Sequence, residues 1–494
     1  MSRIEMIVQA EHDSAASSLR SQVRPAAHHT RPPRIVLRTP WRKAVLTVSI
    51  LAVLATTALS PITSHATAAS NDEITLRAVR NPDRTTRVTC RVTISGRMTT
   101  PSDSGPVNHD LKSECSFIFD QREFPSPAIG ISGVRAVRHF EEAQSETKVG
   151  GGHQTETRLP SSHRLVHLYG AGMGLIPLSP TVRFTRQQVD LLQIPLDPTV
   201  VSGLLPTRNL RDQTEKWNTE DWVIPALTGI EATASQKNSC QLKELTKQKA
   251  VISFDAEVSG AITGTVSDIH ISGELNLDRE SGLITEVTAQ LKEKRSPGTV
   301  SPGLDVTADI HWTQEVSNRE TSLPDSIPMD EPSESRKLLT LSTPWKLLML
   351  HSRQWHLFHE TSELVMLRML HEGRLVAQCN VAPSVRVAPG TSTDPETFQS
   401  EVQTALTTRK GKIIDSTIRP DVNGWRIQRV RATSATDKKT ILWDYYLCTQ
   451  KTGEQFSLIF SRTSDDDAFF GDSAEQILST MTMKATPARI PLPK

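Results

Sequence analysis

Residues 251–260 read VISFDAEVSG, and the apolar residues of this stretch fall on every second position. One set of alternate positions is apolar and the other is polar: Ile252, Phe254, Ala256 and Val258 against Ser253, Asp255 and Glu257. Successive side chains of a β-strand point to opposite faces of its sheet. The stretch therefore predicts a strand that is dry on one face and wet on the other.

The same alternation recurs in three segments further along the chain. Its apolar positions are Ile269, Ile271, Leu275 and Leu277, then Leu283, Val287, Ala289 and Leu291, then Leu304, Val306, Ala308, Ile310 and Trp312. Between two of these segments, residues 278–282 (DRESG) have the composition of a short hairpin loop. One-sided strands joined by short loops predict a mainly antiparallel β domain over residues 72–316, with a curved sheet or a half-barrel.

Few segments of this domain are suited to cover the dry face. The helical candidates are residues 185–193, which carry Val189, Leu191 and Leu192, and a short turn near 218–227. A broad sheet with few helices resembles the half-barrels of periplasmic lipid carriers of the LolA and LppX type, although no motif is shared. The resemblance implies an apolar ligand in the concave face. The alternative is a sheet filled by its own side chains and short helices.

A proline-rich segment follows this domain. Residues 317–342 combine several acids with few apolar residues, so we expect a solvated linker. Its prolines are Pro324, Pro328 and Pro332. The linker separates the β-rich domain from a second domain over 343–486, and residues 487–494 form a tail.

The second domain is predicted to alternate strands with two helices. One helix begins after the N-cap Asp394 and ends near Gly411. Another opens at Ser473, whose spacing to Gln476 is that of a capping box. The predicted strands read KLLMLH, WHLFHE, ELVMLRML and RLVAQCNVA before the first helix, and KIIDSTI, WRIQRVRA, TILWDYYLC and EQFSLIFS after it.

This order of hairpin, helix, antiparallel meander and terminal helix resembles the PsbP-like domain. The resemblance covers residues 340–486 and rests on the segments VAQCNVAP…PETFQSEVQ and ILWDYYLC…EQFSLIF. It implies an α/β/α antiparallel sandwich, which places the whole chain in the α+β class. Members of that group are mostly exported or peripheral binding and assembly modules without a catalytic motif, so no functional residue is carried over. The rest of the chain resembles uncharacterised envelope proteins of bacteria.

The N-terminus has the order of an export signal. Residues 44–60 read AVLTVSILAVLATTALS without a charge, and they follow a basic segment, 1–43, that we expect to be disordered. Ala66 and Ala68 then form a small-x-small site of the kind that signal peptidase accepts. Two interpretations stay open: a signal peptide over 44–68 that is cleaved, and a membrane anchor that is retained. In both, the rest of the chain is exported to the cell envelope.

The charge balance argues against nucleic acid as a partner. The chain carries 56 Lys and Arg against 55 Asp and Glu, a formal net charge of +1. Without residues 1–43, 48 basic and 52 acidic residues remain, which gives −4. A mildly acidic chain without a basic block lacks the electrostatic footprint of phosphate-backbone binding.

Five cysteines occur, and none forms a C-x-x-C pair, so zinc binding is poorly supported. Cys90 and Cys115 lie in two runs of alternating apolar and polar residues that predict a hairpin. Both side chains would point to its apolar face and lie almost opposite each other. A Cys90–Cys115 disulfide is one interpretation, and two buried thiols are the other. Cys379 and Cys448 are a second candidate pair, which leaves Cys240 without a partner.

Catalytic patterns are absent from the sequence. No G-x-S-x-G, H-E-x-x-H, Walker or EF-hand pattern occurs, and the glycines at 170, 172 and 174 suit a turn. The histidines near Glu360 are expected to be solvated or packed, and three consecutive carboxylates to stay hydrated. These residues are His351, His356, His359 and His371, and Asp465, Asp466 and Asp467. We predict no catalytic, cofactor-binding or metal-binding residue.

The sequence thus favours an exported, non-catalytic envelope protein that acts in binding or assembly with an envelope partner. An alternative is a carrier that holds a lipid or other apolar ligand in the β-rich domain. A third hypothesis is an unrecognised hydrolase that would need His351, His359 and the Asp465–Asp467 carboxylates close together.

Overall fold

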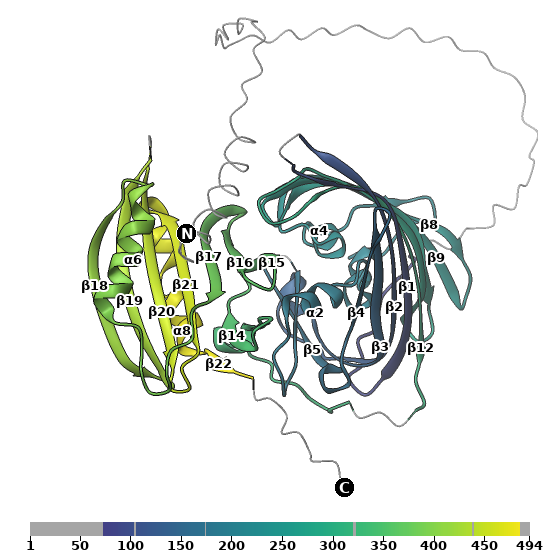
Figure 1. Cartoon of the computed structure of the whole chain (residues 1–494). Helices are drawn as coiled ribbons and strands as arrows, with labels where there is room; N and C mark the ends of the chain where they lie inside the picture. Colours follow the sequence, from purple (N-terminus) through teal and green to yellow (C-terminus); the bar gives the residue numbers. More distant parts are fainter. Residues whose placement is uncertain (1–72, 103–104, 173, 320–322, 437–438, 485–494) are drawn as a thin grey trace, which may run out of the picture.

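The computed structural model describes residues 73–102, 105–172, 174–319, 323–436 and 439–484. The predicted leader with Ala66 and Ala68, the basic segment 1–43 and the tail 487–494 lie outside these residues. None of the helices in the described ranges has both the length and the apolar character that a membrane crossing requires. The described chain forms two regions, coloured purple to teal and green to yellow in Figure 1.

The first region is built on a twelve-stranded antiparallel sheet. Its strands are β1 (Thr85–Thr100), β2 (Val107–Glu123), β3 (Arg135–Val149), β4 (His153–Arg158), β5 (Leu165–Ala171), β6 (Gly174–Leu178), β7 (Lys216–Trp217), β8 (Ala232–Leu245), β9 (Lys249–Ile262), β10 (Thr265–Asp278), β11 (Leu283–Arg295) and β12 (Gly303–Val316). The spatial order is β6-β5-β3-β2-β1-β12-β11-β10-β9-β8-β7, with β4 also paired to β3. The prediction of a β-rich, antiparallel architecture is confirmed.

The alternation in the sequence matches the two faces of this sheet. Ile252, Phe254, Ala256 and Val258 are at most 4% exposed, while Ser253, Asp255 and Glu257 are more accessible. The sheet is open in the described part of the chain, because β6 and β7 end the order without pairing to each other. Its middle is made by strands from opposite ends of the region, since β1 is bonded to β12 with Cys90 opposite Trp312.

The concave face of the sheet is covered by residues 184–230, which we call the plug. Figure 1 shows α2 and α4 inside the curve of the sheet. The helices of the plug are α2 (Arg186–Leu191), α3 (Pro198–Val201), η3 (Ser202–Leu204) and α4 (Val223–Thr228); η1 (Gly130–Gly133) and η2 (Ser161–His163) lie in loops between strands. Thr185 begins α2 with a capping box to Gln188. Val200, Leu204 and Val223 of the plug are fully buried against the sheet, so the chain fills most of the concave face with its own side chains.

The second region contains a seven-stranded sheet in the order β15-β16-β17-β21-β20-β19-β18 and a three-stranded sheet, β13-β14-β22. The strands are β13 (Leu339–Ser342), β14 (Leu347–His351), β15 (Trp355–Glu360), β16 (Val365–His371), β17 (Arg374–Pro383), β18 (Lys412–Val422), β19 (Trp425–Ala435), β20 (Thr440–Gln450), β21 (Gln455–Thr463) and β22 (Thr482–Met483); the helices are α5 (Glu334–Lys337), α6 (Pro395–Thr407), η4 (Ser464–Asp466), α7 (Asp467–Phe470) and α8 (Ser473–Ser479).

The two faces of the larger sheet have different covers. Phe398, Val402 and Leu406 of α6 pack on one face. Ile477 and Leu478 of α8 pack on the other face together with residues of β14. Because that second face is shared between a helix and a small sheet, a complete α/β/α sandwich is not established, and the PsbP-like identity stays a prediction.

Two local predictions for this part of the chain are wrong. Ser473 does not form a capping box, because α8 begins after Asp472 and no side chain caps it. The segment 317–342 is not wholly solvated, since Leu323 and Ile327 are 7% and 5% exposed against the first region. These two apolar residues cover Val137 and neighbouring side chains that the sheet would otherwise expose to water.

Candidate functional site

A pocket of about 350 Å³ remains between α2 and the concave face of the sheet. That volume lies at the lower end of the range of small-ligand sites, roughly 300–1,000 Å³. Its apolar lining comes from β1, β2 and the plug: Val92, Ile94, Phe117, Leu191 and Pro195. Ser113, Gln187 and Asp190 are among its polar residues. The pocket combines an apolar surface with polar groups, as sites for amphiphilic molecules do.

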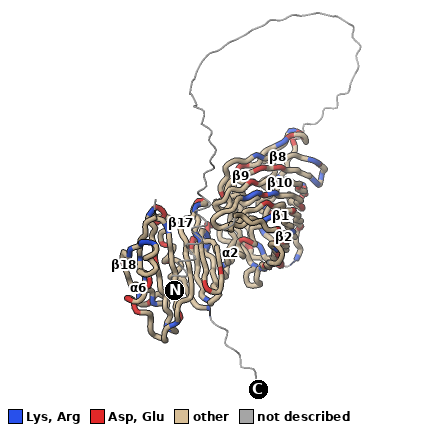
Figure 2. Tube along the Cα trace, turned by 45° about the horizontal axis from the view of Figure 1, so that its top comes forward, with Lys and Arg blue, Asp and Glu red and all other residues tan. Residues whose placement is uncertain are grey.

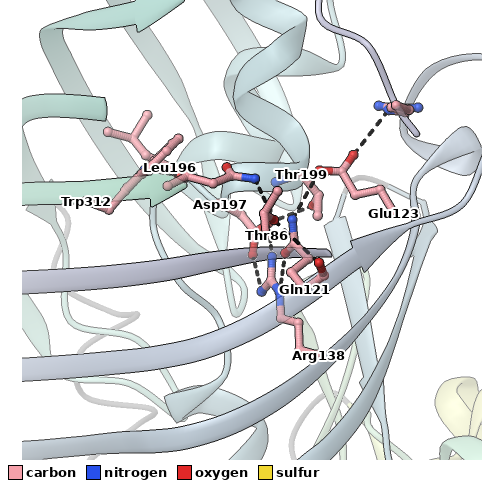
Figure 3. A network of polar contacts seen from close by, with 10 residues as sticks. Thr86, Gln121, Glu123, Arg138, Leu196, Asp197, Thr199 and Trp312 are labelled. Atoms are coloured by element: carbon pink, nitrogen blue, oxygen red, sulfur yellow. Dashed lines mark hydrogen bonds and ion pairs between the residues drawn. The ribbon is translucent and has the colours of Figure 1, made fainter. Parts of the chain in front are cut away.

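Next to this pocket, a buried ion pair joins the plug to the sheet. Nη1 and Nη2 of Arg138 on β3 donate to the two carboxylate oxygens of Asp197 at 2.8 and 2.6 Å (Figure 3). Arg138 is 0% exposed and Asp197 is 2% exposed. Asp197 lies two residues after Pro195 of the pocket and precedes α3, whose Thr199 donates to it through both its backbone N–H and its hydroxyl.

Gln121 on β2 extends this network toward the surface. Nε of Arg138 donates to the side-chain oxygen of Gln121 at 2.7 Å, and the side-chain nitrogen of Gln121 donates to Glu123 at 3.1 Å. Glu123 in turn lies 3.5 Å from Nε of Arg80. Burial raises the pKa of Glu123, and Arg80 opposes that shift. The groups satisfy one another, so the network stabilises the contact between plug and sheet rather than presenting a free acid or base.

The sequence analysis did not identify Arg138 as a site residue, although the pattern of β3 contains a signal for it. It occupies the dry-face position between Ala136 and Phe140 in the alternation of β3, and both neighbours are buried. A charged residue in an apolar position of a half-buried strand requires a buried partner. The sequence does not indicate that this partner is Asp197, because 58 residues separate the two.

The wet face of the sheet carries a broad trough of about 960 Å³. Side chains from eight neighbouring strands line it, and the polar ones include Arg91, Glu142, Lys243, Glu274, Gln290, Asp309 and His311. His311 is paired through Nε2 with Glu286 at 3.1 Å, and this hydrogen bond lowers the pKa of Glu286. Basic and acidic residues are interspersed over both regions in Figure 2.

The candidate disulfides are not present in the structure. None of the cysteines, all of which lie in the described ranges, is part of a disulfide bond. Cys90 stands opposite Phe117 rather than Cys115, which is paired with Val92. Cys379 and Cys448 lie on β17 and β20, with β21 between them. Strands are about 4.8 Å apart, so two strand spacings exceed the Cα separation of roughly 7 Å beyond which a disulfide cannot form.

The residues of the hydrolase hypothesis are kept apart. His351 is buried on β14 and its Nδ1 is 2.8 Å from the carbonyl of Ser352, whereas His359 is exposed on β15. In the described part of the chain, no contact joins either histidine to the three carboxylates. The glycines at 170, 172 and 174 lie at the turn between β5 and β6.

The expectation that all three carboxylates stay hydrated is wrong for Asp466. It is 2% exposed and pairs with Arg374, while Asp467 accepts a hydrogen bond from Nε of Arg462 at 2.6 Å. Arg462 also donates to the buried Asp444 at 2.7 Å. No group of three or more His, Cys, Asp or Glu side chains within the described ranges is arranged to hold a metal ion.

Comparison with known proteins gives no family. Neither a protein-family model nor a curated protein matches the chain. A protein from Bacteroides thetaiotaomicron is 9% identical over 30% of this chain and 48% of its own, with a TM-score of 0.23. Lipovitellin is 9% identical over 52% of this chain and 29% of its own, with a TM-score of 0.27. The translocator domain of the autotransporter NalP from Neisseria meningitidis is 7% identical over 77% of this chain and 88% of its own, with a TM-score of 0.11.

The chain thus spans less than half the length of the first two of these structures. Scores and identities this low establish neither a shared fold nor a shared function.

Proposed function

We propose that this chain is an exported, non-catalytic protein of the cell envelope that acts by binding. The observation that carries the proposal is the pocket between α2 and the sheet, whose walls come from β1 to β4 and the plug. Asp190, the carboxylate in its lining, lies 3.9 Å from Nη1 of Arg186, and Arg138 and Asp197 near the pocket form a buried pair. Pairing of this kind favours a binding surface over an acid–base centre, which requires a group with a free proton position.

Export rests on residues 44–60 and the basic segment before them. Fractionation of the native host with a carbonate wash tests it. We expect the chain in the membrane fraction if the apolar segment is retained, and in the soluble envelope fraction if it is removed. A purely cytosolic chain would contradict the proposal.

A second candidate function is the carriage of an apolar or amphiphilic ligand, and the apolar lining of the pocket favours it. Val92, Phe117 and Leu191 offer contact to a hydrocarbon chain, and Gln187 and Asp190 offer contact to a polar head group. The ligand would be small, because the plug occupies the rest of the concave face.

Titration of the chain with a fluorescent fatty acid tests this carrier function. Leu191→Trp adds bulk inside the pocket, and we expect it to weaken binding at least tenfold. Val266→Trp adds the same side chain at a position that is 63% exposed, and it should bind like the unmodified chain. Equal binding by all three proteins, or none by the unmodified chain, would count against the carrier function while leaving the envelope location open.

A further inference from the structure

The two regions meet where α2 of the plug contacts the segment between β14 and β15. Nη2 of Arg186 on α2 donates to the carbonyls of Arg353 and Trp355. Arg353 reaches back, because its Nη2 donates to the carbonyl of Pro177 in the first region at 2.7 Å. Figure 1 shows β14 and β15 facing the plug at this place. We call these contacts, together with His351 and His356, the joint.

Further contacts hold the regions together away from the joint. The backbone N–H of Thr340 donates to the carbonyl of Phe184 at 2.8 Å. Arg368 donates to the carbonyl of Thr299 in the loop between β11 and β12. The acceptors of these contacts are carbonyl oxygens, and the carboxylate of Asp190 lies 3.9 Å from Nη1 of Arg186 on the same helix.

The joint has an excess of buried positive charge. The charged groups around the two histidines are Arg186 and Asp190 on α2, Glu231 before β8, Glu334 and Lys337 near α5, Arg353 after β14, and Arg368 opposite His356 on β16. Asp190 is 57% exposed and Glu334 is 85% exposed, whereas the side chain of Arg186 is 20% exposed. Glu475 of α8, the helix that packs on β14, is engaged by Arg419. Asp190 and Glu334 are thus more accessible than Arg186, although burial raises the pKa of Asp190 and Arg186 opposes that shift.

We propose that the joint is an acid-sensitive contact, in which protonation of His351 and His356 releases the second region from the first. A proton on either ring adds a positive charge beside Arg186 in a place that water reaches poorly. Burial of a further cation without a partner carboxylate is unfavourable. Separation of the regions exposes both rings to water, and this removes the cost.

The titration of the two rings gives the direction and the pH window. Burial, with a smaller effect of Arg186, lowers the pKa of His351 to about 4. Burial, Arg186 and His351 lower the pKa of His356 to about 3. In the separated state both pKa values return toward the ordinary value of about 6.5. That state therefore binds protons below pH 6.5 while the docked state does not, so docking weakens as the pH falls from about 6.5 to 4.

With the ordinary pKa fully restored on separation, we expect each histidine to lower the docking equilibrium constant about 30-fold at pH 5. Small-angle X-ray scattering of the full chain at pH 7.5 and pH 5 measures the consequence, with circular dichroism as a check that both regions stay folded. We expect a larger radius of gyration at pH 5 and recovery of the compact form on return to pH 7.5. A radius that does not change between these conditions would overturn the proposal.

Variants assign the effect to the two rings. His351→Gln with His356→Gln should keep the chain compact at pH 5, whereas His359→Gln, on an exposed residue of the same strand as His356, should behave like the unmodified chain. An equal expansion of the double variant would contradict the proposal.

Asp190→Asn provides a second test that leaves the buried histidines intact. Loss of this exposed acid leaves more positive charge at the joint, so release should shift to higher pH, and an unshifted midpoint would count against the proposal.

Discussion

The indole Nε1 of Trp312 donates to the backbone carbonyl of Leu196 at 3.0 Å, and this bond links the sheet to the plug. Leu196 is fully buried and has a φ of 54°, a left-handed conformation that is unfavourable for a residue with a branched side chain. The next residue is Asp197, which Arg138 holds from β3. Two strands of the sheet therefore fix two consecutive residues of the plug, as Figure 3 shows.

Trp312→Phe should lower the free energy of unfolding by about 2–4 kcal/mol. The variant leaves a buried carbonyl without its donor and opens a small cavity on β12. Denaturant unfolding measures the change. Trp222→Phe is the matched control, since its indole donates to Glu220 at an exposed position. A loss at Trp312 no larger than that at Trp222 would mean that the bond to Leu196 does not hold the plug.

Asp197→Ala should cost about 3–5 kcal/mol of stability, because it leaves the guanidinium of Arg138 buried without a carboxylate. The measurement is again denaturant unfolding of the full chain. Glu156→Gln breaks an ion pair with Arg158 in which both side chains are more than half exposed, and it should change stability by less than about 1 kcal/mol. Similar losses of stability in the two variants would show that the buried Arg138–Asp197 pair contributes no more than an exposed ion pair.

Gly264→Ala should weaken the docking of the second region. Gly264 lies at the β9–β10 turn, where an added Cβ would lie 2.0 Å from the carbonyl oxygen of Gly373 at the β16–β17 turn. Its φ is 74°, which by itself disfavours alanine. Gly390→Ala controls for that strain, because Gly390 has a φ of 77° and open space around it. We expect greater separation of the regions by X-ray scattering for Gly264→Ala alone, and equal scattering of the two variants would refute the contact.

The cysteines should react slowly with an alkylating reagent in the folded chain and completely after unfolding without a reductant. Burial raises the pKa of Cys90 and of Cys240 to about 12, so almost no thiolate is present at pH 8. Mass spectrometry of the unfolded, alkylated chain should give five modified thiols. Three modified thiols would instead show that one of the candidate disulfides forms in the native environment, and one modified thiol would show that both form.

The strands of the first region were predictable because a half-buried strand shows its environment at every second residue. Ile269 and Ile271 are buried and His270 between them is not, so the pattern identifies β10 without any knowledge of its neighbours. The order of the strands was not predictable. Backbone hydrogen bonds carry no side-chain signature, so nothing in β1 indicates that β12 rather than a nearer strand lies beside it.

The plug illustrates the same limit at the candidate site. Its helix α2 was expected from the spacing of Val189 and Leu192. Its anchoring by Arg138 was missed, since a buried ion pair requires both the strand pairing and the path of the loop before α3. The linker was misjudged for a related reason. Leu323 and Ile327 are too sparse to give a period, and their burial is explained only by the apolar side chains of β3 and its neighbours that they cover.

The pairing of β1 with β12 also sets a condition on biosynthesis. On the ribosome, Thr85–Thr100 emerges long before Gly303–Val316, and in the meantime one edge of the first hairpin has no neighbour. Closing so distant a contact is slow, because the entropy of the long intervening polypeptide is lost before the contact forms. A nascent chain that stops before residue 303 would present that bare edge to other molecules, as an aggregation-prone strand does.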